Sequence, residues 1–165
     1  MLYKIESKKL LPKKVVFTKG YGFDKYKLIS FEKALRSAGI ERFNLVKVSS
    51  ILPKRIKIGG IKDLEKIEDG EIVFGVIAIN YSKKDFFGSS IGYVFPKNKN
   101  IHGYLTEYEF NSKKDLSSEA EKIAIKLFKS KFPEEEIESS GYFGIFKKPK
   151  KNYYNCCVSA AIFIM

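Results

Sequence analysis

Runs of apolar and polar positions predict a chain in which strands outnumber helices. Segments rich in β-branched and aromatic residues, bounded by glycine, proline and polar residues, indicate strands. Apolar positions repeated at i, i+3, i+4 and i+7 indicate two helices, one from Ser30 to Gly39 and one from Ser118 to Pro133. The expected strands are residues 15–17, 43–50, 71–80, 91–95, 103–110, 142–146 and 153–165. Because the strands cluster in runs, we expect an α+β protein.

The first predicted helix contains a carboxylate with two possible roles. Ser30 is expected to cap this helix, and Gly39 is expected to end it. Glu32 would then lie in the first turn, where the helix dipole favours a carboxylate. The same side chain could instead be a counter-charge for a cationic ligand, and the pattern leaves both roles open. Leu35, about one turn later, would share the face of Glu32.

Length and composition limit the classes of protein that the chain can represent. A chain of 165 residues is long enough for one domain, so residues 1–165 are expected to fold as a single unit. No apolar run reaches the roughly eighteen residues needed to span a bilayer, and the N-terminus lacks the apolar core of a signal peptide. The adjacent Cys156 and Cys157 suit a reducing compartment, because a disulfide between neighbours would be strained. We therefore expect a soluble, cytoplasmic protein without a membrane partner.

The net charge of +12 at pH 7 raises nucleic acid as a partner. Only Arg36, Arg42 and Arg55 among the 31 basic residues are arginines, and the others are lysines scattered along the chain. Arginine binds bases and phosphates with two donors at once, whereas lysine acts as a point charge. We therefore expect the lysines to form a solvated surface and expect no nucleic-acid partner. A basic nucleic-acid-binding module is kept as the alternative to an enzyme.

Two adjacent serines, Ser49 and Ser50, follow the strand that begins at Phe43 and precede an aliphatic pair and Pro53. A buried hydroxyl costs about 1–3 kcal/mol unless it is hydrogen-bonded. Self-cleavage would explain the pair, because the Ser50 hydroxyl can attack the Ser49 carbonyl and convert the peptide bond into an ester. Elimination would leave Ser49 with a free carboxylate and Ser50 as dehydroalanine, which hydrolyses to a pyruvoyl group. A pyruvoyl carbonyl condenses with amines and accepts electrons, as pyridoxal phosphate does.

The simpler explanation is that this serine pair only ends a strand, since serine pairs are frequent in the chain. The other pairs are Ser89-Ser90, Ser117-Ser118 and Ser139-Ser140. Glycines beside the first and third pairs indicate turns, and the second pair fits a capping box before a helix. The glycine-rich residues 19–23 likewise predict a tight loop. The dipeptide alone therefore does not decide between cleavage and a turn.

The predicted strand 103–110 places Leu105, Glu107 and Glu109 on one face. Carboxylates at i and i+2 repel each other, which favours a proton on one of them, as a general acid requires. A solvated outer face is the alternative. The only histidine, His102, has no partner motif, and no Cys/His cluster has the spacing of a metal site. We therefore expect no metal.

Several short motifs occur in a fixed order between Leu11 and Pro53. They are Leu11-Pro12, Gly20, residues 30–35 (SFEKAL), residues 38–40 (AGI), Asn44-Leu45 and residues 48–53 (VSSILP). This ordered set resembles the pyruvoyl-dependent arginine decarboxylase family. The similarity resumes more weakly at residues 95–97 and 103–109, and the small residues 156–161 and the chain length also fit.

The resemblance implies a four-layer αββα sandwich of mostly antiparallel sheets that assembles as a homotrimer. It also implies self-cleavage between Ser49 and Ser50, which gives a β chain of residues 1–49 and an α chain of residues 50–165. The implied cofactor is a covalent pyruvoyl group made from Ser50. The implied reaction is decarboxylation of L-arginine to agmatine and carbon dioxide, a step in polyamine biosynthesis that needs no pyridoxal phosphate.

The same resemblance assigns roles to individual residues. Glu107 would return a proton to the substrate after carbon dioxide leaves, and Asn44 would be an active-site amide. Glu32, Leu35 and Ile51 would bind the substrate, with Glu32 facing the guanidinium group. The family usually has the shorter aspartate at the position of Glu32. A related pyruvoyl decarboxylase that acts on another amino acid is therefore the alternative function.

Asn44 and Ser50 have the same parity, so an extended strand would point both to one side. Six residues of extended strand span roughly 20 Å, which is too far for direct contact. We therefore expect each site to combine Ser50 of one protomer with Glu32, Leu35 and Asn44 of the next.

Overall fold

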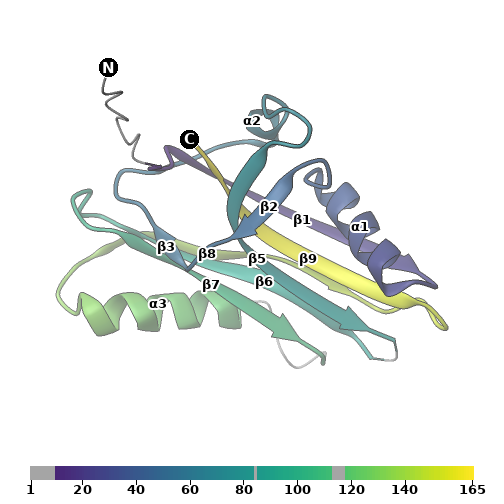
Figure 1. The fold of residues 1–165 in the computed structure, drawn as a ribbon. Coiled ribbons are helices and arrows are strands. Elements are labelled where there is room, and N and C mark those ends of the chain that lie inside the picture. Colours follow the sequence, from purple (N-terminus) through teal and green to yellow (C-terminus); the bar gives the residue numbers. More distant parts are fainter. Residues whose placement is uncertain (1–9, 84, 113–117) are drawn as a thin grey trace, which may run out of the picture.

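The computed structural model describes residues 10–83, 85–112 and 118–165, which form two β-sheets and three helices (Figure 1). The sheet orders are β2-β5-β9-β1-β4 and β3-β7-β6-β8. Two neighbouring pairs, β2–β5 and β1–β4, are parallel, and the other pairs are antiparallel. In chain order the elements are β1 (Lys14–Asp24), α1 (Lys27–Ala38), β2 (Asn44–Lys47), β3 (Ile51–Leu52), β4 (Lys57–Ile58), α2 (Ile61–Leu64), β5 (Ile72–Ser82), β6 (Phe87–Pro96), β7 (Gly103–Phe110), α3 (Glu119–Lys131), β8 (Ile137–Lys147) and β9 (Tyr154–Ile164).

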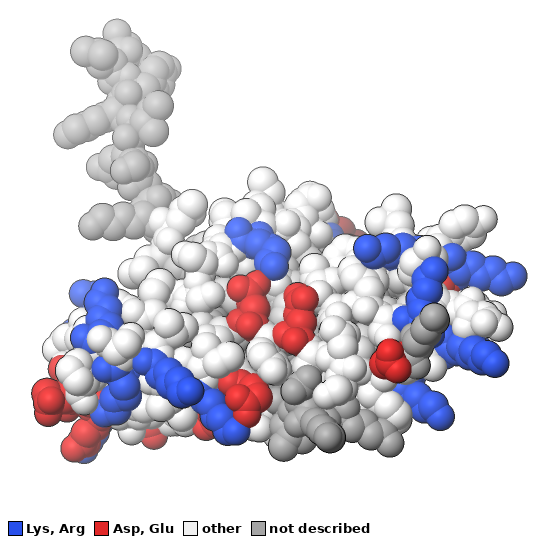
Figure 2. Space-filling view, turned by 90° about the horizontal axis from the view of Figure 1, so that it is seen from below, with Lys and Arg blue, Asp and Glu red and all other residues white. Residues whose placement is uncertain are grey.

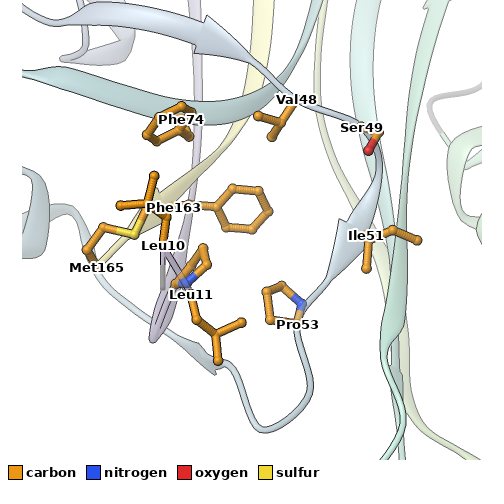
Figure 3. Close-up of a pocket in the computed structure, with 10 residues that line it drawn as sticks. Leu10, Leu11, Val48, Ser49, Ile51, Pro53, Phe74, Phe163 and Met165 are labelled. Carbon is orange, nitrogen blue, oxygen red and sulfur yellow. The ribbon is translucent and has the colours of Figure 1, made fainter. Parts of the chain in front are cut away.

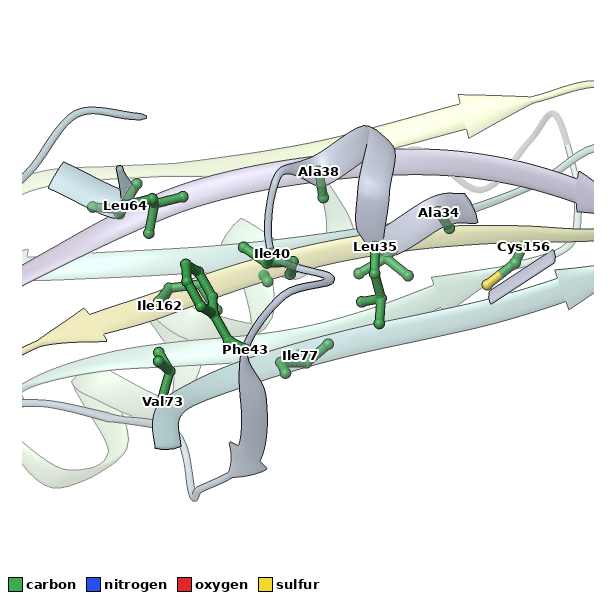
Figure 4. Close-up of a cluster of buried hydrophobic side chains, with 13 residues drawn as sticks. Ala34, Leu35, Ala38, Ile40, Phe43, Leu64, Val73, Ile77, Cys156 and Ile162 are labelled. Carbon is green, nitrogen blue, oxygen red and sulfur yellow. The ribbon is translucent and has the colours of Figure 1, made fainter. Parts of the chain in front are cut away.

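The two sheets pack face to face, with α1 outside the five-stranded sheet and α3 outside the four-stranded sheet (Figure 1). Three clusters of buried apolar side chains hold these layers together. The cluster between the sheets includes Val76, Ala78, Ile91 and Leu105. The cluster under α1 includes Leu35, Ile40, Phe43 and Ile77 (Figure 4). The cluster under α3 includes Val94, Ala124 and Phe128. The expected α+β class and its αββα layers are therefore confirmed.

Strand β1 is much longer than the expected strand 15–17, because residues 19–23 continue it instead of forming a loop. The glycines in this segment serve helix packing. A Cβ atom added to Gly20 or Gly22 would collide with the backbone of α1 near Ala34. Helix α1 therefore lies directly on the bare backbone of β1. The loop prediction was wrong because the glycines reflect a contact with a distant segment.

Helix α1 begins earlier than the sequence pattern predicted. Its N-terminal cap is Tyr26, and Ser30 lies inside the helix, where its hydroxyl donates to the carbonyl of Lys27 at 2.7 Å. Glu32 is therefore outside the first turn, so the helix-dipole explanation for it was wrong. The predicted end is confirmed, because Gly39 adopts a left-handed conformation with φ of 71°.

Two serine pairs that were assigned to turns lie inside strands. Ser89 and Ser90 belong to β6 and are buried, and the Ser89 hydroxyl lies 3.0 Å from that of Ser159. The pair at residues 139–140 belongs to β8. Ser118 precedes α3 but makes no capping hydrogen bond with its side chain, and Ser117 lies outside the described residues. The predicted turns and capping box were therefore wrong.

The charged surface is uneven. Figure 2 shows basic side chains mainly toward the two ends of one face, with acidic side chains near its middle. Several lysine ammonium groups lie over aromatic rings, including Lys83 at 3.7 Å from the Tyr154 ring centroid and Lys150 at 4.2 Å from that of Phe23. Each of these ammonium groups is attracted electrostatically to the face of the ring beneath it.

Candidate active site

The pair Ser49-Ser50 lies where the chain crosses from one sheet to the other. Strand β2 ends at Lys47 at the edge of the five-stranded sheet, and β3 begins at Ile51 at the edge of the four-stranded sheet. The expected continuous strand to residue 50 is therefore wrong. A backbone hydrogen bond to each sheet holds the crossing segment. Val48 N–H donates to the Gly75 carbonyl in β5 at 3.1 Å. Leu105 N–H in β7 donates to the Ser50 carbonyl at 2.8 Å.

The backbone folds tightly around Ser50. The N–H of Ile51 donates to the carbonyl oxygen of Ser49 at 3.0 Å, which closes a three-residue turn centred on Ser50. Ser49 is exposed and Ser50 is half-buried, so the expected burial of both hydroxyls is wrong. The turn supplies a different chemical feature. An N–H already points at the oxygen that would become negative if Ser50 attacked Ser49.

A pocket of about 350 Å³ opens beside Ser49 (Figure 3). Ser49 and Ile51 form one wall, and the start and end of the described chain form the opposite one. The lining residues are Leu10, Leu11, Pro12, Val48, Ser49, Ile51, Pro53, Phe74, Phe163 and Met165. These side chains include no carboxylate, so a guanidinium group would find no counter-charge among them.

The two carboxylates of β7 have different partners. Leu105 is buried between the sheets, and Glu107 and Glu109 follow it on the same face. Glu107 Oε1 lies 3.0 Å from the ammonium nitrogen of Lys47. Glu109 Oε1 instead accepts a hydrogen bond of 3.2 Å from the N–H of Ile79 in β5. Glu107 is therefore beside the segment that leads to the serine pair, whereas Glu109 joins β7 to β5.

Lys47 is a residue for which the sequence pattern predicts no role. Strand β3 runs antiparallel to β7, with Ile51 opposite Tyr104, so residues before Ile51 run beside residues after Tyr104. Lys47 itself is paired with Gly75 of β5 in the other sheet, and its side chain reaches Glu107 between the edges of the two sheets. The signal available in the sequence was a cation three residues before Ser50, within the motif-rich segment.

The remaining predicted site residues lie elsewhere in the chain. Asn44 begins β2, is exposed, and donates from Nδ2 to the Gly70 carbonyl at 2.6 Å. Glu32 is on α1 and pairs with Arg36 at 2.6 Å. Leu35 is buried in the cluster under α1 (Figure 4). Because α1 covers the outer face of the five-stranded sheet, the fold of one chain does not bring Glu32 to the serine pair.

The two cysteine thiols are not ionised enough to act as nucleophiles near neutral pH. Burial raises the pKa of the Cys156 thiol to about 12, and burial also raises the pKa of Cys157. Both thiols are therefore neutral near pH 7. Across residues 10–83, 85–112 and 118–165, no group of three histidine, cysteine, aspartate or glutamate side chains could hold a metal ion. No helix within these ranges is long and apolar enough to cross a bilayer.

Comparison with known proteins identifies first the class of enzyme and then the family. The family model described as pyruvoyl-dependent arginine decarboxylase (PvlArgDC) matches residues 14–165. The protein is therefore a carboxy-lyase that depends on a pyruvoyl group. It is 40% identical over 161 residues to pyruvoyl-dependent arginine decarboxylase 1 of Archaeoglobus fulgidus. The aligned region covers 94% of this chain and 100% of that relative.

A second relative gives the same result. The chain is 38% identical over 163 residues to pyruvoyl-dependent arginine decarboxylase 1 of Methanosarcina mazei, covering 95% of this chain and 98% of the relative. The chain belongs to the pyruvoyl-dependent arginine decarboxylase family. The resemblance of the motifs between Leu11 and Pro53 is thereby confirmed.

Proposed function

We propose that the chain cleaves its own peptide bond between Ser49 and Ser50 and that the cleaved protein decarboxylates L-arginine to agmatine and carbon dioxide. The products of cleavage would be a β chain of residues 1–49 and an α chain of residues 50–165. The observation that carries this proposal is the turn in which Ile51 N–H donates to the Ser49 carbonyl at 3.0 Å. Membership of the family supports both the cofactor and the substrate class.

The first step is a transfer of the acyl group of Ser49 from nitrogen to oxygen. Ser50 Oγ attacks the carbonyl carbon of Ser49 while the hydroxyl proton is lost, and negative charge develops on the carbonyl oxygen. The N–H of Ile51 stabilises this charge because it already donates to that atom. The bond from the carbon to the Ser50 nitrogen then breaks, the nitrogen takes a proton, and an ester remains.

The second step releases the two chains. Ser50 Cα loses a proton, and the Ser49 carboxylate leaves from Cβ, so that residue 50 becomes dehydroalanine. Addition of water and loss of ammonia then give the pyruvoyl carbonyl. Exposure of Ser49 lets water reach the bond and lets ammonia leave. The hydrogen bond of 2.8 Å from Leu105 N–H to the Ser50 carbonyl keeps the new end of the α chain on β7.

A pyruvoyl group at residue 50 of the mature enzyme would supply a carbonyl electrophile and an electron sink for the decarboxylation. Glu107 would hold the proton that is returned to the substrate α-carbon. Its position on β7, the strand that also binds the Ser50 carbonyl, supports this role. The apolar side chains of the pocket beside Ser49 would favour loss of the charged carboxylate.

The guanidinium group of arginine requires a carboxylate that the pocket lacks. We assign that role to Glu32 of a neighbouring protomer, together with Leu35 and Asn44 of the same neighbour, in a homotrimer. The position of Glu32 on α1, away from its own serine pair and with a side chain 40% exposed, supports this sharing. The guanidinium group of Arg36 is hydrogen-bonded to the Glu32 carboxylate. Substrate binding must therefore displace Arg36 from this carboxylate or share the carboxylate with it.

Mixed oligomers test the shared site. Ser50→Ala and Glu32→Gln variants are each expected to be inactive, but their co-assembly creates sites with an intact Ser50 and an intact Glu32. Random mixing in equal amounts in a closed ring restores about one quarter of the sites. Complete absence of recovered activity in verified mixed oligomers would refute sharing between protomers.

Cleavage and substrate have separate tests. The wild-type chain is expected to run as two fragments in denaturing electrophoresis, and Ser50→Ala is expected to run as one. Release of carbon dioxide from arginine, lysine, ornithine and histidine then identifies the substrate. The ion pair between Glu32 and Arg36 is the reason for testing other amino acids, because Arg36 offsets the negative charge that Glu32 offers to a substrate side chain.

A further inference from the structure

We propose that Lys47 is a positioning residue that pairs with Glu107 before cleavage and with the new carboxylate of Ser49 after cleavage. This inference rests on the proposed self-cleavage. It assigns a role to an ion pair that links the segment before the cleaved bond to the strand that carries the proposed acid. The change of partner would make the acid available only after the pyruvoyl group has formed.

The ion pair between Lys47 and Glu107 lies between the two sheets. Lys47 is the last residue of β2, and its ammonium nitrogen lies 3.0 Å from Glu107 Oε1 on β7. The pair therefore joins the edges of the two sheets. Cleavage after Ser49 would leave Lys47 on the β chain and Glu107 on the α chain. Within the described residues, neither side chain has another ion pair.

Cleavage would create a new negative charge close to Lys47. Ser49 now presents a neutral carbonyl oxygen, which becomes a full carboxylate when the ester is eliminated. Lys47 and Ser49 are two positions apart, or about 7 Å in an extended chain, which a lysine side chain can span. The hydrogen bond from Val48 N–H to Gly75 holds the intervening residue on β5. The new carboxylate therefore forms within reach of the Lys47 ammonium group.

Few charged groups surround Glu107. On the face of β7 that carries Glu107, its charged neighbours among the described residues are Lys47 and Glu109, since β3, β5 and β6 carry no charged side chains. The charged side chains of α3 belong to the helix on the outer face of the same sheet. The titratable side chains of β3, β5 and β6 are the tyrosines Tyr81 and Tyr93. When Lys47 turns to Ser49, Glu107 keeps only the like charge of Glu109 nearby. The Glu107 carboxyl group is then released from its ion pair and can face the substrate.

The exposure of the pair makes it suitable for substitution. The side chains of Lys47 and Glu107 are 54% and 32% exposed, and ion pairs in contact with water contribute little to folding stability. Lys47→Met is therefore expected to fold. Lys47→Arg keeps the charge. Lys122→Met is a matched control, because Lys122 forms a comparable exposed pair with Glu119 on α3, away from the serine pair.

Zero-length carbodiimide cross-linking measures the partner of Lys47 directly. In full-length Ser50→Ala, which keeps the bond intact, an amide should join Lys47 to Glu107. In the cleaved wild type the yield of this cross-link between the fragments should fall several-fold, and a β chain lighter by one water should appear from an amide between Lys47 and the Ser49 carboxylate. Peptide mass spectrometry identifies both products.

The outcomes separate this inference from the proposed function. Equal yields of the Lys47–Glu107 cross-link in both proteins, without a dehydrated β chain, would overturn the change of partner and leave self-cleavage standing. A wild-type chain that stays uncut would overturn the proposed function, and this inference with it.

The pH profile of the mature enzyme distinguishes a positioning role from a purely structural one. Removal of the cation is expected to move the alkaline limb of kcat to higher pH in Lys47→Met, because the Ser49 carboxylate is left uncompensated near the acid. Lys47→Arg should restore the profile, and Lys122→Met should leave it unchanged. An unmoved limb in Lys47→Met would overturn the proposal.

Discussion

Removal of the N–H of Ile51 is the sharpest test of how the chain would cleave itself. This N–H donates to the Ser49 carbonyl at 3.0 Å and would stabilise the charge that develops there. Loss of one donor from such a site slows a reaction by about 10²–10³, or about 3–4 kcal/mol in activation free energy. Ile51→Pro removes the donor, and we expect its half-time for cleavage to lengthen by that factor. The assay is a time course of fragment formation in denaturing electrophoresis, starting from freshly refolded, uncut protein.

The position of Ile51 makes the proline tolerable. Strand β3 is at the edge of its sheet, and the Ile51 N–H is used in the turn, so the substitution removes no bond between strands. Ile51→Val keeps the N–H and should cleave at nearly the wild-type rate. An ester in place of the amide between residues 50 and 51 removes the same N–H with the side chain intact and should also be slow. If Ile51→Pro with native circular dichroism cleaves within a few-fold of Ile51→Val, the assigned role of the N–H is wrong.

Three further predictions concern packing and reactivity. Gly20→Ala would press a methyl group into the backbone of α1 and should lower the free energy of unfolding by about 1–3 kcal/mol in denaturant titration, whereas Gly60→Ala meets no atom within 4 Å and should have little effect. Phe128→Ala empties a fully buried site under α3 and should cost about 3–5 kcal/mol, whereas Leu127→Ala, at a side chain 40% exposed, should cost far less; equal losses would contradict the assigned core. The Cys156 thiol, with a pKa raised to about 12, should resist alkylation at pH 8 in the folded protein and react after denaturation. Rapid alkylation of Cys156 in the native protein would refute its burial. Because this thiol ionises at a lower pH in the unfolded chain than in the folded one, the contribution of Cys156 to stability should decline as the pH rises above about 9.

The local sequence pattern predicted the bounds of an element correctly where those bounds depend mainly on residues within the element. The expected strand 103–110 coincides with β7, and the last strand differs from β9 by one residue at each end. Gly39 ends α1 in the left-handed conformation that glycine adopts without steric cost. In each case the deciding interaction lies within a few positions along the chain, so the sequence contains it directly.

Local pattern failed where glycine and serine serve contacts between distant segments. Gly20 is a strand residue because α1 packs against it, and a glycine in isolation gives no sign of that neighbour. Ser89 lies in a buried strand because its hydroxyl meets that of Ser159, 70 positions away. Propensity alone assigns both residue types to turns, so these errors follow from the tertiary contacts that override it.

The sequence by itself determined the family and the bond between Ser49 and Ser50 as the place where chemistry is expected, because the ordered motifs around that bond are contiguous in the chain. Only the tertiary structure decided that this bond spans two sheets, that Ile51 N–H faces the carbonyl to be attacked, and that Glu107 meets Lys47. The physical reason is strand pairing. The antiparallel pairing of β3 with β7 joins two segments that are remote in the chain, and the residues within a few positions of either segment do not identify its partner strand.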